Sequence, residues 1–349
     1  MQKKAGKIFK RSLLALLILV IALVVIYWEL VVYGFRQGRG QFTIIWNARP
    51  VEEVLADPTF PDSLKTKLNL IKEVRKYAID SLGLKDTENY KTLYDQQGEE
   101  IMWVVTACEP FQFIPKEWKF PILGAVPYKG FFSKEKAIEL RNELEKEGWD
   151  TSIRNPGGWS TLGWFTDPIL SGMLERSEGD LANLIIHEMV HSTIFVKDSI
   201  DFNENLATFI GDRGAEKFLL STYGKNSKEY TDYLQLDIDF TRYSNHMLHG
   251  TELLDSLYQS MKENDPTEVK KKLKTETIQK IVDALDTLTL LQHQKPSQRF
   301  KERLPNNTYF LNMKRYQSKQ DTFWEEYNGT FKSDLKYYIK FLSEKHPFL

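Results

Sequence analysis

The sequence His-Glu-Met-Val-His at residues 187–191 places two histidines four positions apart near the middle of a 349-residue chain. On an α-helix, positions i and i+4 lie on the same face, so both imidazoles can bind one metal ion. Apolar residues flank the motif at helical spacing, and Ser177 followed by Asp180 is typical of a capped helix start. The sequence therefore predicts a buried helix with metal ligands at His187 and His191. The alternative is a pair of core histidines that bind no ion.

A third ligand is expected from Glu204, which follows in the segment Asp-Phe-Asn-Glu-Asn at residues 201–205. Asp201 or Asn203 would cap a second helix and place Glu204 in its first turn, and this helix can be turned back against the first. Two histidines and one carboxylate are a ligand set of catalytic Zn²⁺ sites, whose fourth position is open to water. Glu188 is then placed to act as the general base of hydrolysis. The alternative for Glu204 is a helix-capping acid.

Other groups that such a site needs are less clearly marked in the sequence. Each ligating histidine should donate its second ring N–H to an acceptor, and Asp212 is one candidate. Hydrolysis also needs a hydrogen-bond donor for the oxyanion. Tyr243 and His246 are candidates, since they are spaced i, i+3 on a helix expected over residues 229–262. The alternative is that both are ordinary residues of an amphipathic helix.

The sequence around the motif resembles a bacterial family of zinc aminopeptidases with an HExxH, gluzincin-like zincin site. The resemblance rests on HEMVHSTIFVK, on FNENLATFIGDRG, and on the preceding GGWSTLGWFTDPILSGML. It extends from about Tyr33 to the region around Pro305 and covers nearly everything after the first apolar segment. It implies a peptidase that binds zinc through the three ligands named above, with Glu188 catalytic and a peptide or protein as substrate.

Functional alternatives stay open at this point. The chain lacks the Gly-x-Met-Glu-Asn string with which one well-known aminopeptidase family holds the substrate's free amine. A zinc endopeptidase is therefore the alternative to an aminopeptidase, and the choice depends on whether an acidic side chain closes the substrate cleft. A non-catalytic scaffold protein of zincin fold is a third alternative, although Glu188 and all proposed ligands are present.

The apolar and turn patterns, together with the resemblance, predict an α+β fold of the zincin type. Expected helices are residues 63–81 and 133–148, and expected strands are residues 101–107, 124–132 and 150–154. We expect a mixed α/β lobe with the metal helix over residues 34–200 and a mainly helical lobe over residues 201–349. The segment from Trp159 to Phe165 would be an edge strand that pairs with extended substrate, with aromatic core as the alternative.

The N-terminus combines basic charge with a long apolar run. Five basic residues lie within residues 1–11, and the stretch from Leu13 to Tyr33 is interrupted only by Glu29. About 20 helical residues span the roughly 30 Å hydrocarbon layer, and flanking basic residues stay in the cytoplasm. We therefore expect a cytoplasmic tail over residues 1–11 and an uncleaved transmembrane signal anchor over residues 12–33. The metallopeptidase domain, residues 34–349, would lie in the periplasm, anchored to the bacterial inner membrane by a single pass.

Charge and cysteine content limit the partners that the chain can bind and the bonds that can stabilise its fold. Without the five N-terminal bases and Glu29, 42 lysines and arginines face 47 acidic residues. This mildly acidic balance argues against nucleic acid as a partner. The only cysteine is Cys108, so the chain contains no internal disulfide and its fold rests on an apolar core.

Overall fold

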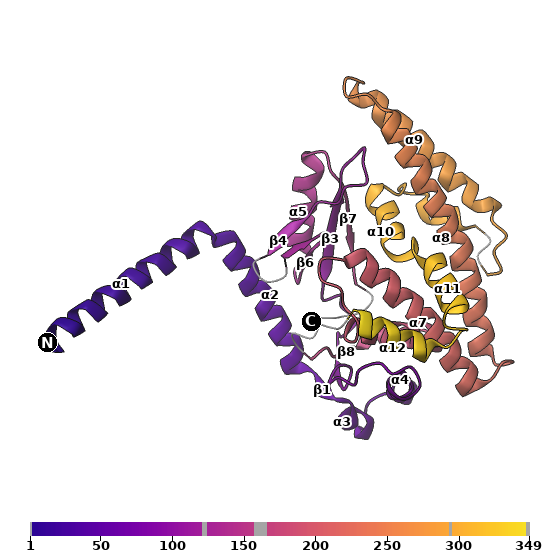
Figure 1. The fold of residues 1–349 in the computed structure, drawn as a ribbon, viewed down its shortest axis with the longest axis horizontal. Helices are drawn as coiled ribbons and strands as arrows, with labels where there is room; N and C mark the ends of the chain where they lie inside the picture. Colours follow the sequence, from indigo (N-terminus) through magenta and orange to yellow (C-terminus); the bar gives the residue numbers. More distant parts are fainter. Residues whose placement is uncertain (1, 121–123, 157–165, 293–294, 347–349) are drawn as a thin grey trace. The chain divides into compact units, whose positions relative to one another are not determined.

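The computed structural model describes residues 2–120, 124–156, 166–292 and 295–346, without the side chains of residues 2–8 and 11. The predicted edge strand over residues 159–165 lies outside these ranges. Within them the chain forms two compact units, Met1–Asn47 and Ala48–Leu349. The fold is mixed α+β and mostly helical (Figure 1).

The helices are α1 (Gln2–Ile26), α2 (Trp28–Asn47), α3 (Val51–Ala56), α4 (Asp62–Asp80), α5 (Lys134–Lys146), α6 (Glu178–His191), α7 (Ile200–Tyr223), α8 (Lys228–Ser260), α9 (Thr267–Ala284), α10 (Asn307–Gln317), α11 (Gln320–Gly329) and α12 (Leu335–Lys345). The strands are β1 (Arg49–Pro50), β2 (Thr92–Tyr94), β3 (Trp103–Cys108), β4 (Trp118–Phe120), β5 (Gly124–Val126), β6 (Lys129–Phe131), β7 (Asp150–Arg154) and β8 (Ile169–Leu170). The expected helix over residues 63–81 and the strand over 150–154 correspond to α4 and β7.

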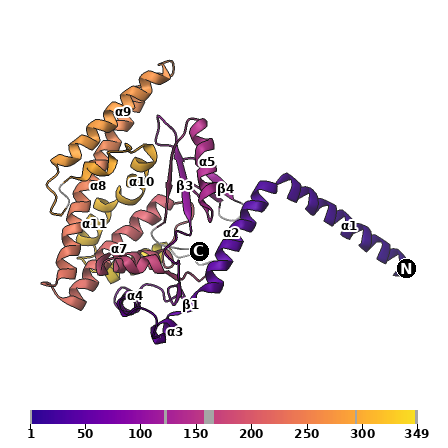
Figure 2. The same cartoon turned by 180° about the vertical axis from the view of Figure 1, so that it is seen from behind.

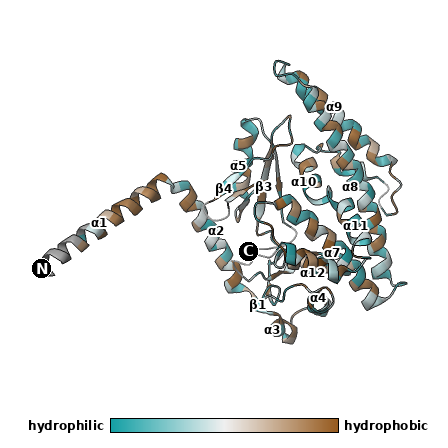
Figure 3. Ribbon diagram, in the orientation of Figure 1, coloured by the Kyte–Doolittle hydropathy of each residue, from teal (hydrophilic) through white to brown (hydrophobic). Residues whose placement is uncertain are grey.

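The N-terminal unit consists of two helices that meet at Tyr27, and the C-terminal half of α1 is apolar on every face (Figure 3). Within the described part of the chain, no single helix is long and apolar enough to cross a membrane. Ser12–Ile26 and Trp28–Asn47 reach that length and hydropathy only together, and they are bent by 86°. The continuous helix expected over residues 12–33 is therefore broken. The β-branched and aromatic run from Val24 to Trp28 has low helix propensity, which favours a break there.

In the described ranges, the β-structure forms three small sheets. β3 is the centre of an antiparallel sheet with the order β6-β3-β7, while β4 pairs with β5, and β2 pairs with β1 and β8. Val105 of β3 and Leu144 of α5 belong to one buried cluster, which packs the helix on this sheet. The strand expected over residues 124–132 is instead two strands in different sheets. Pro127 separates them, because proline has no N–H to donate to a ladder.

The core of the larger unit is a hairpin of α6 and α7. The Ser177 hydroxyl accepts a hydrogen bond from the Asp180 amide at 3.1 Å and caps α6 as the sequence predicts. Two glycines of α7, Gly211 and Gly214, face α6. A Cβ placed on Gly211 would lie 3.0 Å from Asn183 Oδ1 and 3.3 Å from His187 Cβ. The absence of side chains at these positions allows the two helix backbones to approach closely.

Other helices hold this hairpin in place. On one side, Phe209 of α7 packs against aromatic rings of α11 and α12, with centroids 5.8 Å from Phe323 and 6.2 Å from Tyr338. On the other side, α10 contacts α7, α8 and β7. Figures 1 and 2 show α10 between the β6-β3-β7 sheet and α8 in both views. The helix α10 therefore joins the β-structure to the helical hairpin.

Replacing Gly179 by alanine is expected to lower the free energy of unfolding by about 1–3 kcal/mol. A Cβ at this position of α6 would lie 2.4 Å from Cδ2 of Tyr233. The Tyr233 ring has little freedom to move, because its hydroxyl accepts a hydrogen bond from Asn183 at 2.8 Å. Chemical denaturation measures the change. Gly329→Ala is the control, since its Cβ would meet no atom within 4 Å, and equal losses in the two variants would contradict the packing argument.

Candidate metal centre

Three side chains of the α6–α7 hairpin converge on one point. The Nε2 atoms of His187 and His191 are 3.1 Å apart, and Glu204 Oε2 lies 3.5 Å and 3.6 Å from them. Tetrahedral ligands bound at roughly 2.0–2.1 Å are about 3.3 Å from one another. The three atoms therefore have the spacing of ligands around one small cation, and they form a possible metal-binding triad.

Electrostatics within the triad also suit a cation. Burial disfavours ionisation of Glu204, but the positive charge of His191 and the hydrogen bonds from His187 and His191 together outweigh it and hold the pKa of Glu204 well below its usual value. Burial likewise opposes protonation of His191, while the negative charge of Glu204 raises the pKa of that imidazole. Two imidazoles and a carboxylate held in mutual contact are the donor set that Zn²⁺ prefers. The residues present thus fit a zinc ion.

The segment Asn203-Glu204-Asn205 explains how Glu204 reaches the histidines. Asn203 does not cap α7 but hydrogen-bonds to the preceding loop. Its Oδ1 accepts a hydrogen bond from the Val196 amide, and its Nδ2 donates one to the Val196 carbonyl, both at 2.8 Å. Helix α7 begins one residue before Asp201 and has no side-chain cap. Glu204 is therefore held on the side of α7 that faces α6.

Asn205 fixes the next part of the site. Its side chain is fully buried; Nδ2 donates to the Asp201 carbonyl at 2.8 Å, and Oδ1 accepts from the Lys319 amide at 2.9 Å. Asp201 in turn accepts a hydrogen bond from Nε of Arg315 at 3.1 Å. These contacts tie the start of α7 to the end of α10, which carries Tyr316.

Tyr316 is a site residue that the sequence did not reveal. Its ring stacks on His187, with centroids 6.5 Å apart and an interplanar angle of 24°. Arg154, at the end of β7, lies close enough to the hydroxyl of Tyr316 to oppose the rise of its pKa. Burial, followed by the negative charge of Glu204, raises the pKa of Tyr316, so it remains a neutral hydrogen-bond donor. No local motif marks Tyr316, because it reaches the triad only through the packing of α10.

Two further tyrosines lie near the carboxylates of the site. Burial, and then the negative charge of Glu204, raises the pKa of Tyr128, which is also affected by Glu188. Tyr90 is fully buried, and its pKa is raised by burial and then by Glu188. Its φ of 60° lies in the left-handed region, which is strained for a bulky residue. The negative charges of Glu188 and Glu204 thus help to keep these two phenols neutral.

Tyr243 and His246, the expected oxyanion donors, make their described contacts elsewhere. The Tyr243 hydroxyl bonds to the Tyr309 hydroxyl at 2.5 Å, within the cluster formed by α8, α9 and α10. His246 Nε2 lies 2.8 Å from the Ile281 carbonyl oxygen of α9. Among the described contacts, none joins either side chain to the triad. Their spacing on α8 was predicted correctly, but the face that they occupy packs on α9 and α10.

Asp212, the expected acceptor for a ligating histidine, instead accepts a hydrogen bond from Asn183 Nδ2 at 2.6 Å. Burial, and then the nearby charge of Asp237, raises the pKa of Asp212 to about 7. Within the described residues, Nδ1 of His191 is buried without a hydrogen-bond partner. The expected second ring N–H bond is therefore missing for this histidine.

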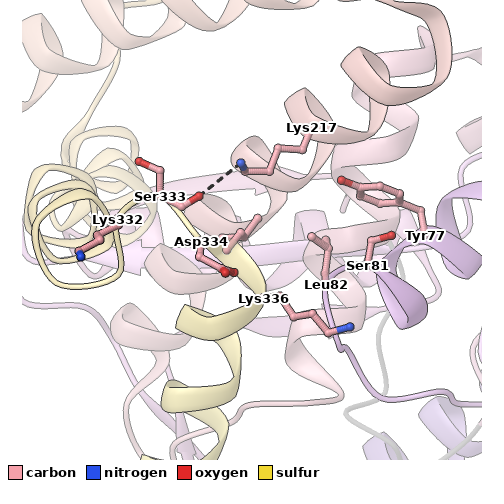
Figure 4. Close-up of a pocket in the computed structure, with 9 residues that line it drawn as sticks. Tyr77, Ser81, Leu82, Lys217, Lys332, Ser333, Asp334 and Lys336 are labelled. Carbon is pink, nitrogen blue, oxygen red and sulfur yellow. Dashed lines mark hydrogen bonds between the residues drawn. The ribbon is translucent and has the colours of Figure 1, made fainter.

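A cavity of about 350 Å³ lies away from the triad, between α4, α7 and the start of α12 (Figure 4). Three of its lining residues are lysines: Lys217 points toward the Ser333 carbonyl, while the amines of Lys332 and Lys336 point in different directions. The Lys336 amine donates to the Asp80 carbonyl at 2.7 Å. Because these cations do not converge, the cavity lacks the geometry of an anion site.

The α+β fold and its possible metal triad can now be compared with known proteins. A family profile described as "Putative aminopeptidase" matches residues 32–345. The match spans nearly the whole sequence, and the chain belongs to this family, whose name designates a peptidase. This confirms the aminopeptidase family expected from the sequence. Among curated proteins and among solved structures, none matches the chain.

We expect the purified full-length protein to bind one Zn²⁺ per chain, and His191→Ala or Glu204→Ala to weaken that binding at least about 100-fold. Each substitution removes one of three convergent ligand atoms. Metal analysis after gel filtration, with a zinc chelator titration, measures stoichiometry and affinity. His246→Gln is the matched control, since its ring bonds to α9. Unchanged zinc affinity in the triad variants would rule out this metal centre.

Proposed function

We propose that the chain is a membrane-anchored zinc aminopeptidase, with its metal bound by His187, His191 and Glu204. The observation that carries this proposal is the convergence of the three ligand atoms at tetrahedral spacing, beside Glu188. The family profile supports the peptidase class and the aminopeptidase name. The basic tail over residues 1–11 and the apolar segment that follows support anchoring in a bacterial inner membrane, with the catalytic unit in the periplasm.

The site residues divide the chemistry among them. When bound, Zn²⁺ would supply a Lewis acid with one open coordination position, which lowers the pKa of water and polarises a peptide carbonyl. Glu188 accepts the proton of the attacking water and then delivers it to the departing amine. Glu188 lies on α6 next to His187, within the same helix as both candidate histidine ligands.

Tyr316 and Arg154 supply the donor that this reaction needs. As the carbonyl carbon becomes tetrahedral, its oxygen gains negative charge, and a neutral phenol next to the metal ligands can donate a hydrogen bond to it. Tyr316 stacks on His187, and the nearby positive charge of Arg154 polarises its hydroxyl. Arg154 also has a buried Nε atom without a partner among the described residues. A positive group in this position favours an anionic transition state.

Hydrolysis of a mixed peptide library, free and N-acetylated, tests the proposed activity. The full-length protein should remove residues stepwise from the N-terminus of free peptides only. Glu188→Gln should retain zinc and lose at least about 1000-fold in kcat, because the general base is removed. Cleavage of blocked peptides would identify an endopeptidase instead. Zinc binding without any hydrolysis would support a scaffold role and refute the proposal.

Tyr316→Phe should lower kcat about 10- to 1000-fold with little change in zinc content or KM, because only the transition state uses the hydroxyl. Steady-state kinetics on the best library peptide, with metal analysis, measures this. Tyr309→Phe is the control on the same helix, since its hydroxyl bonds to Tyr243. If Tyr316→Phe retains full kcat, or if both variants lose activity equally, Tyr316 has no role in the transition state.

A further inference from the structure

The second helix of the N-terminal unit carries a row of exposed apolar side chains. Trp28, Val31, Phe35, Phe42 and Trp46 are 60%, 41%, 72%, 62% and 76% exposed. Their spacing of 3, 4, 7 and 4 residues places all five on one face of α2, because each residue advances about 100° around a helix. The rings of Phe42 and Trp46 stack at 5.4 Å. We call these five residues the aromatic stripe.

Polar residues border the stripe along its length. Glu29, Arg36, Thr43 and Asn47 follow one another at helical spacing and are all exposed. Arg39 lies beside the stripe near its middle, and its long side chain can direct the guanidinium away from an apolar phase. Tryptophan and phenylalanine next to arginine are typical of helices at a membrane surface, where aromatic rings occupy the headgroup boundary. A membrane-spanning helix would instead be apolar on every face.

The bend between the two helices sets the direction of α2, and of the stripe on it, relative to α1. The segments Ser12–Ile26 and Trp28–Asn47 are bent by 86° at Tyr27. If the apolar segment of α1 runs along the membrane normal, a helix at nearly a right angle to it lies in the membrane plane. Only the break at Tyr27 separates the stripe from that apolar segment, so its first residue is already at the membrane boundary.

We propose that α2 is an interfacial helix, whose aromatic stripe inserts into the surface of the membrane that α1 enters. This inference rests on the membrane anchoring in the proposed function. The rings would sit about 5–10 Å into the boundary between headgroups and acyl chains, and Arg36 and Arg39 would face anionic headgroups. The membrane contact then includes most of α2 and extends well beyond the span expected from the sequence.

A straight span would give a different depth for Trp46. If α1 and α2 formed one continuous helix that left the membrane near Tyr33, Trp46 would stand about 20 Å from the boundary, in water. The interfacial helix places Trp46 within the headgroup region instead. The depth of residue 46 therefore distinguishes the two arrangements.

The test uses the full-length protein in vesicles of zwitterionic and anionic phospholipids at about 3:1. A nitroxide is attached to Trp46→Cys, and in separate samples to Phe42→Cys, Thr43→Cys and Lys225→Cys. Cys108 is buried and its thiol pKa is raised to about 12 by burial, so it does not compete for the label. Collision with oxygen, which concentrates in lipid, and with a water-soluble nickel chelate reports the depth of each label.

We expect the labels at positions 42 and 46 to be at least about fivefold less accessible to nickel than the label at Lys225, an exposed residue of the larger unit. Thr43, on the polar border, should give an intermediate value. If the labels at positions 42 and 46 report the same depth, the result cannot be due to the loss of one aromatic ring at either position. Labels at both positions as accessible as that at 225, in protein that resists extraction by alkaline carbonate, would overturn the interfacial helix and leave the anchor intact. Extraction by carbonate would refute the anchor itself.

Discussion

The site depends above all on the close approach of α6 and α7. Gly211 and Gly214 remove the side chains that would separate the helices at this contact. A larger spacing would draw the Glu204 carboxylate away from the two imidazoles, and ligand atoms must lie within a few tenths of an ångström of their ideal positions to share one ion. Helices α11 and α12 pack on one side of α7, and α10 packs on the other. These contacts hold α7 against α6 and maintain the spacing.

Much of the site could be predicted because its signals are local. The two histidines are related by one turn of α6, and Ser177 marks the start of that helix at short range. Glu204 lies on the next helix, so a short connection limits where it can go. The capping residues predicted for α7 were wrong for a physical reason. The Asn203 side chain hydrogen-bonds to the backbone of the preceding loop and not to the backbone of the helix. A short polar side chain can do either, and only the loop conformation decides which.

Residues placed by long-range packing could not be predicted in this way. Tyr316 reaches His187 because Asn205 and Arg315 fix α10 against the start of α7. The sequence near Tyr316 contains no motif that predicts these contacts. Tyr243 and His246 show the converse case, since their helix and spacing were predicted but its orientation was set by packing on α9 and α10. Helical periodicity identifies a face of a helix without identifying the neighbour that covers it.

The order of these residues along the chain has a consequence for how the protein matures. All three ligands lie between residues 187 and 204, so a short loop closes the triad at small entropic cost. Ribosomal synthesis completes that hairpin well before Tyr316 is made. A nascent chain can therefore bring the three triad side chains together before it has the phenol that stacks on His187. The triad and the ring that stacks on one of its histidines are therefore assembled at different stages of synthesis.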